Sequence, residues 1–168
     1  MPNAKLLNYL HLHFIVFIWG FTAVLGALIS IDALGLVWFR MSIASLLILA
    51  WVGYKKIPLT FSKKTMLVFF IAGAVIAMHW LAFFGAIKTA NVSITLAIMS
   101  TGSFFTAFLE PIFYKRKIIW YEVVFGLIVV LGLYVIFQVE GDYSWGIVLA
   151  LISSFLGALF SVIIGKLA

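Results

Sequence analysis

Long apolar segments make up most of the chain, and they constrain its fold more than any other feature. A helix rises about 1.5 Å per residue, so roughly 20 residues are needed to cross the hydrocarbon core of a bilayer. Six segments have about that length, and only short turns separate them. They are approximately residues 11–29, 33–52, 65–84, 90–113, 118–139 and 145–165. The sequence therefore predicts an all-α fold, a polytopic bundle of six membrane-spanning helices.

The composition excludes a water-soluble globule. Of the 168 residues, 66% are hydrophobic and only 10% are charged, whereas soluble domains carry roughly a quarter charged residues. A soluble domain of this length could not bury so much apolar surface, so we expect the lipid bilayer to be its main partner. The chain has no cysteine, which excludes disulfides and thiolate metal sites.

The net charge of +6 comes from residues between the apolar segments. The basic residues do not form one stripe with interleaved aromatic residues, so we expect no nucleic-acid partner. Nine of them fall at the amino terminus, in the second and fourth loops and after the sixth segment: Lys5, Lys55, Lys56, Lys63, Lys64, Lys115, Arg116, Lys117 and Lys166. The alternate loops hold only Lys88, with Asp32, Glu140 and Asp142. The positive-inside rule then predicts a cytoplasmic amino terminus in a multi-pass protein of the inner cell membrane.

Polar residues inside the segments fall at similar depths. Counting from the segment ends, Arg40 lies about 10 Å below the outer face, and His79, in a segment that starts from the cytoplasm, reaches a similar level. Ser93 and Thr95 complete this outer-half layer. A charge in hydrocarbon costs about 2.5 kcal/mol or more, so such residues usually face a bundle interior or a wet cavity.

Each of these residues also has a structural interpretation, which the sequence leaves open. Arg40 either contributes to a binding site or reaches toward the interface and clamps backbone carbonyls. His79 either contacts solute or protons, or is a neutral histidine hydrogen-bonded between helices. Ser93 and Thr95 most often satisfy their own helix.

Glu110 is a carboxylate inside the fourth segment, in "AFLEPIFYKRK" near its cytoplasmic end. Pro111 removes a backbone donor beside it and favours a kink. We interpret Glu110 as a structural tie to Lys115 or Arg116, with a proton-coupling carboxylate as the alternative.

Small residues recur at a spacing of four in the sixth segment and predict close helix packing. One stripe is Gly146, Ala150, Ser154 and Ala158, and beside it run Ser153, Gly157, Ser161 and Gly165.

Enzyme motifs are absent from the sequence. It has no Gly-x-Ser-x-Gly elbow, no His-Glu-x-x-His helix and no phosphate-cradling loop, and its three histidines are not spaced as a metal site. We therefore expect no catalytic residues, no metal and no cofactor.

Four stretches carry a family resemblance: "FIWGF", "VWFR", "HWLAFFGAIKTANVSITL" and "FGLIVVLGLYVIF". They resemble the EamA family of the drug/metabolite transporter superfamily. The resemblance implies two five-helix repeats of inverted topology that move small organic metabolites by alternating access, as an exporter or permease. We expect residues 1–140 to form the first repeat and residues 141–168 to begin a second.

A sixth helix without that second repeat would leave its small-residue stripes unused, so we expect a fragment of a longer transporter. The alternative is a half-transporter completed by dimerisation. The sequence departs from the family pattern at two places. Many members carry a carboxylate in the turn between the fourth and fifth helices, where this chain has "YKRK", and Glu110 lies too early to be its equivalent. The mid-helix proline of the fourth helix is also missing, near Thr101 and Gly102.

The resemblance implies a substrate cavity near the midplane, lined by helices one, three and four. The residues expected there are Trp19, Thr22, His79, Trp80, Phe83, Thr95 and Met99. Arg40, on the second helix, is expected to brace this layer. A non-transporting membrane scaffold or assembly subunit is the alternative function.

Overall fold

We analysed a computed structural model, which describes the backbone of residues 2–139 and 143–167 and the surroundings of side chains 5–135 and 143–167. Glu140, Asp142 and the expected repeat boundary between residues 140 and 141 lie outside the described residues. The regular secondary structure of the described residues is helical, without a strand. Its helices are α1 (Pro2–Leu28), α2 (Ala33–Lys55), α3 (Lys63–Thr89), α4 (Val92–Met99), α5 (Gly102–Tyr114), α6 (Trp120–Val139) and α7 (Ser144–Gly165).

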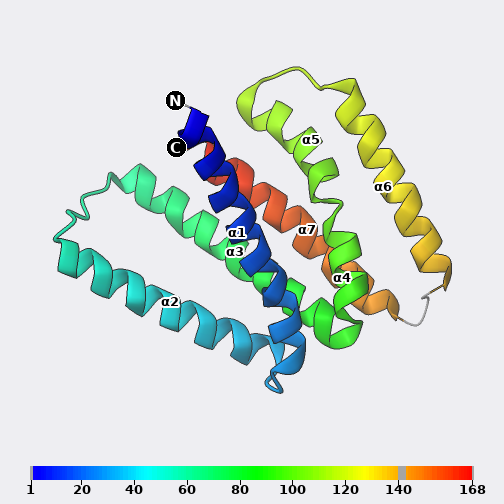
Figure 1. Cartoon of the computed structure of the whole chain (residues 1–168), viewed down its shortest axis with the longest axis horizontal. Helices are drawn as coiled ribbons and strands as arrows, with labels where there is room; N and C mark the ends of the chain where they lie inside the picture. Colours follow the sequence, from blue (N-terminus) through cyan, green and yellow to red (C-terminus); the bar gives the residue numbers. More distant parts are fainter. Residues whose placement is uncertain (1, 140–142, 168) are drawn as a thin grey trace.

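Successive spans run in alternating directions, with α4 and α5 following one another along a single span (Figure 1). The start of α1, the α2–α3 loop, the α5–α6 loop and the end of α7 lie at one end of the bundle (Figure 1). These are the segments that carry the nine basic residues, and we call this the basic end. The α1–α2 and α3–α4 turns lie at the opposite end (Figure 1).

Five stretches are long and apolar enough to cross a membrane, as expected from the sequence. They are Lys5–Leu28, Ala33–Lys55, Lys63–Thr89, Val92–Tyr114 and Ser144–Gly165. The predicted span 118–139 corresponds to α6, whose apolar part, Trp120–Val135, is shorter than the others. The protein is therefore a multi-pass helical membrane protein.

The helix starts follow from side-chain caps. Asp32 accepts a hydrogen bond from Gly35 N (2.9 Å) at the start of α2, and Ser62 accepts one from Thr65 N (3.1 Å) at the start of α3. Asn91 caps α4 in the same way, through Ile94 N (2.9 Å). Each cap satisfies a backbone N–H that has no partner in its own helix. These short polar turns hold neighbouring spans close together.

The most extensive helix contact joins α3 and α7, and α4 and α5 also pack on α7. All four residues of the first small-residue stripe of α7 are buried: Gly146, Ala150, Ser154 and Ala158. The expectation that the stripes would be unused without a second repeat was therefore wrong for the first stripe, because α3, α4 and α5 of the same chain pack on α7. The cause is small side chains, which let helix backbones approach closely. In the second stripe Ser153 is buried, whereas Ser161 and Gly165 are exposed.

Candidate functional site

The fourth span is interrupted near its middle, where the sequence lacks the expected proline. α4 ends at Met99 and α5 begins at Gly102. The buried hydroxyl of Ser154, on α7, donates to Met99 O (3.2 Å), and the hydroxyl of Thr101 lies 2.9 Å from Ser154 Oγ. An interrupted helix persists within a membrane only where other groups satisfy the freed backbone. Helix α7 therefore supports the interruption directly.

His79 is buried between α3 and α7, where it contacts Ser153. Its Nδ1 lies 2.8 Å from Ser153 O and 3.1 Å from Ser153 Oγ, while Ser153 Oγ donates to His79 O (3.1 Å). Because the Ser153 carbonyl oxygen can only accept a hydrogen bond, Nδ1 carries the proton in this contact and donates to Ser153 O. The second ring nitrogen, Nε2, has no hydrogen-bond partner among the described residues and is free to accept a bond from a solute.

Gly157 explains how the histidine ring comes so close to α7. A Cβ at this position would lie 3.1 Å from both Cε1 and Nδ1 of His79. Without a side chain, Gly157 leaves room for the imidazole against the backbone of α7.

Aromatic residues continue from His79 along α3. The Trp80 ring stacks on Phe84, with centroids 5.7 Å apart and planes tilted by 22°, and meets Phe83 edge to face at 5.5 Å. Arg40 reaches across from α2, and its Cζ lies 3.8 Å from the centroid of the Trp80 ring. A cation over an indole face gains roughly 0.5–2 kcal/mol. Arg40 is thus held against the layer that contains His79.

A cavity of about 390 Å³ opens beside Arg40, between α1, α2 and α3. Its polar lining consists of Arg40 and Thr22, and its other walls are apolar. Gly26 lets α1 approach the buried Phe84 here, because a Cβ on Gly26 would lie 2.5 Å from Phe84 Cε1.

The expected substrate residues separate into a central group and outlying ones. Phe83 is buried in a cluster against which Trp80 and Met99 pack, and Trp80 also contacts His79. Thr22 lies in the Arg40 cavity instead. Thr95 donates to Asn91 O of its own helix (2.8 Å). Trp19 is 69% exposed on α1, away from the central group.

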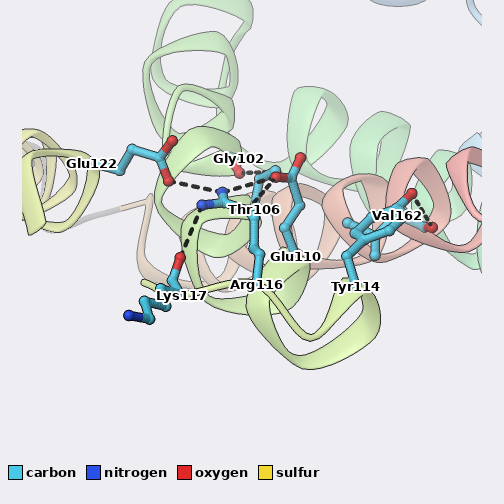
Figure 2. A network of polar contacts seen from close by, with 8 residues as sticks. All are labelled: Gly102, Thr106, Glu110, Tyr114, Arg116, Lys117, Glu122 and Val162. Carbon is cyan, nitrogen blue, oxygen red and sulfur yellow. Dashed lines mark hydrogen bonds and ion pairs between the residues drawn. The ribbon is translucent and has the colours of Figure 1, made fainter. Parts of the chain in front are cut away.

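Glu110 belongs to an ion-pair network at the basic end (Figure 2). Nη2 of Arg116 lies 2.8 Å from Glu110 Oε2 and 2.9 Å from Glu122 Oε2, so one guanidinium joins α5 to α6. Nearby, the Tyr114 hydroxyl donates to Val162 O of α7 (3.1 Å; Figure 2). A second cavity, of about 410 Å³, lies beside the pair of glutamates.

The hydrogen bonds to Glu122 and Glu110 raise the pKa of Arg116 above its ordinary value. Such a group contributes stability that is complete below its unfolded-state pKa and is lost only as the pH rises through the raised value. Since that pKa is already far above neutrality, the Arg116 side of the network stays charged across physiological pH. The charge of Arg116 therefore holds α5 and α6 together over this whole pH range.

A comparison with models of protein families shows to which family the chain belongs. A model of the EamA-like transporter family matches residues 7–138, which is most of the sequence. The chain belongs to the EamA-like transporter family. The match begins in α1 and ends in α6, so it confirms the resemblance seen in the sequence. No curated protein and no solved structure matches the chain.

Two groups of residues in this EamA-like chain escaped the sequence analysis. Ser153 and Ser154 were assigned to packing stripes alone, yet their hydroxyls bind His79 and the interruption of the fourth span. Adjacent serines in an otherwise apolar segment were the available signal. Glu122, only six residues after Arg116, was the signal for the second ion pair.

Proposed function

We propose that this EamA-like protein is a secondary transporter that moves small organic metabolites across the inner cell membrane by alternating access. The observation that carries the proposal is the match to a transporter family over residues 7–138. The interrupted fourth span supports it, because discontinuous helices commonly form the solute sites of transporters.

The solute path in this proposal runs along the central group of α3 and α4. His79 Nε2 offers a hydrogen-bond acceptor, and Trp80, Phe83 and Met99 supply an apolar wall. A few polar groups in an apolar wall suit small organic solutes. Three other expected residues are weaker candidates for this path. Thr22 lies in the Arg40 cavity, Thr95 donates to the N-cap of its own helix, and Trp19 is exposed.

The cavity is completed, in this proposal, by a second repeat of the same chain or by a dimer partner. Residues 1–140 form the first repeat, and 141–168 open the second. The family match ends at residue 138, close to the proposed boundary. The apolar exposed face of α1, which includes Trp19, offers a surface for such a partner.

Transport by the chain in proteoliposomes tests the function. We expect uptake of at least one solute from a panel of labelled amino acids, organic acids and nucleosides, and a loss of about tenfold or more in Trp80→Ala. Trp51→Ala is the matched control, because Trp51 lies exposed near the end of α2. His79→Ala is paired with His13→Ala in the same way, since His13 is exposed. Unchanged transport in both Trp80→Ala and His79→Ala would remove this path from consideration.

We also propose that the basic end faces the cytoplasm and that α6 completes six spans. The gathering of nine basic residues at one end supports this orientation. The chain has no cysteine, so single cysteines report topology without background. Ile31→Cys, between α1 and α2, is expected to react with an impermeant maleimide added outside intact cells. Leu59→Cys, a loop position between α2 and α3 that is more exposed than Ile31, is expected to react only after permeabilisation, and the reverse pattern contradicts the orientation.

A further inference from the structure

We propose that the cavity between α1, α2 and α3 binds the acid group of a small amphipathic organic anion through Arg40 and Thr22. The proposal goes beyond transport: His79, Trp80, Phe83 and Met99 do not line this cavity, and binding there requires no movement of solute across the membrane. It also changes the expected role of Arg40 from bracing the polar layer to contacting a ligand.

The charge of Arg40 has no counter-ion among the described residues. The described carboxylates are engaged elsewhere: Glu110 and Glu122 pair with Arg116, and Asp32 caps α2. The Arg40 guanidinium makes no hydrogen bond or ion pair within the described chain, and its described contacts are the faces of Trp80 and Phe84. Contact with a ring face leaves the in-plane N–H donors unused. A bound anion would neutralise the charge of Arg40 and accept hydrogen bonds from these N–H groups.

Thr22 supplies a second polar contact from another helix. Thr22 lines the same cavity from α1, and its hydroxyl has no hydrogen-bond partner among the described residues. In this it differs from Thr89, Thr95 and Thr106, whose hydroxyls each donate to a carbonyl of their own helix or its cap. A carboxylate can accept a bidentate pair from arginine and a further bond from a hydroxyl.

The size and walls of the cavity select the ligand class. A volume of about 390 Å³ falls in the range of small-ligand pockets and is far too small to enclose a two-chain phospholipid. Beyond the two polar groups, the lining is apolar, with Leu25, Phe39 and Ile43 among its members. An acid group joined to a short apolar body matches both parts, whereas a strongly polar dicarboxylate would leave a charge against the apolar wall.

Octanoate and its neutral analogue octanol provide the probe pair. The whole chain is placed in phosphatidylcholine nanodiscs, with empty nanodiscs as the background, and binding is followed by calorimetry and by the fluorescence of Trp80 beneath Arg40. Trp80→Phe identifies that part of the fluorescence change among the six tryptophans. We expect saturable binding of octanoate but not of octanol. Arg40→Gln is expected to weaken octanoate binding about tenfold or more, and Thr22→Val severalfold.

Thr106→Val is the matched control, because it also removes a threonine hydroxyl but lies beside the other cavity, near Glu110. Its octanoate affinity is expected to equal that of the wild type. Equal saturable binding of octanol and octanoate, or unchanged octanoate binding in Arg40→Gln and Thr22→Val, overturns the proposal. So does displacement of octanoate by phosphatidylglycerol at a low mole fraction, since the occupant would then be a lipid. The comparison of octanoate with octanol needs no variant, so poor folding of Arg40→Gln leaves the test intact.

Discussion

Replacement of Gly146 by valine is expected to force α7 away from α3. A Cβ at Gly146 would lie 2.5 Å from Ala90 Cβ and 3.0 Å from Ala90 N, so the obstruction includes the backbone itself. Neither atom belongs to a flexible side chain that could turn aside. Overpacking of this kind costs roughly 1–3 kcal/mol, and more where the backbone cannot yield. We expect a loss of stability at the upper end of that range, measured as the free energy of unfolding in mixed detergent micelles.

Gly73→Val is the control for this variant. Gly73 also lies in a membrane-spanning helix, α3, but a Cβ there would meet no atom within 4 Å. Its free energy of unfolding should therefore remain within about 0.5 kcal/mol of the wild type. If both valine variants unfold alike, close approach at Gly146 does not hold the two helices together.

The second large effect is expected for Ser153→Val. Ser153 is fully buried, and its hydroxyl both contacts His79 Nδ1 and donates to His79 O. Valine removes these bonds and adds a methyl group where α7 already packs tightly against α3. A lost buried hydrogen bond costs roughly 0.5–1.5 kcal/mol and overpacking adds about 1–3 kcal/mol. We expect a total of about 2–4 kcal/mol in the same unfolding measurement.

Two further serine variants separate these causes. Ser153→Ala removes the hydroxyl without overpacking, so its loss should be about 1 kcal/mol. Ser161→Val places the same valine on the exposed side of α7, where the serine hydroxyl bonds Gly157 O of its own helix, and it should be nearly neutral. A Ser161→Val effect as large as that of Ser153→Val would show that valine weakens α7 irrespective of its contacts with α3.

Much of the architecture could be predicted because it depends on length and composition. Five apolar stretches are long enough to cross a membrane, as expected from their lengths in the sequence. The fourth span is interrupted near Thr101 and Gly102, where the chain lacks the mid-helix proline common in the family. The partner of α7 was not predictable, because a stripe of small residues shows that a helix packs closely but not against which neighbour.

The sequence indicated which residues of the candidate site share a level along the bundle, but not which neighbour each residue faces. Trp80 contacts both Arg40 and His79, so these two side chains lie near one another. Counting along a helix gives the height of a residue, but the rotation of the helix depends on its neighbours. This is why His79 lies against Ser153 of α7, and why Thr22 faces Arg40's cavity instead of the His79 group.

The sequence by itself determined that this is a multi-pass helical membrane protein of the EamA-like family, with its basic residues gathered at one end. These properties follow from hydrophobic length, charge placement and short family patterns, each of which is local along the chain. Only the tertiary structure decided that α7 packs on α3, that Arg116 joins Glu110 to Glu122, and that Arg40 meets Trp80 beside a cavity. Such contacts depend on how each helix is rotated and which helix lies beside it, and both are set by packing between segments distant in sequence.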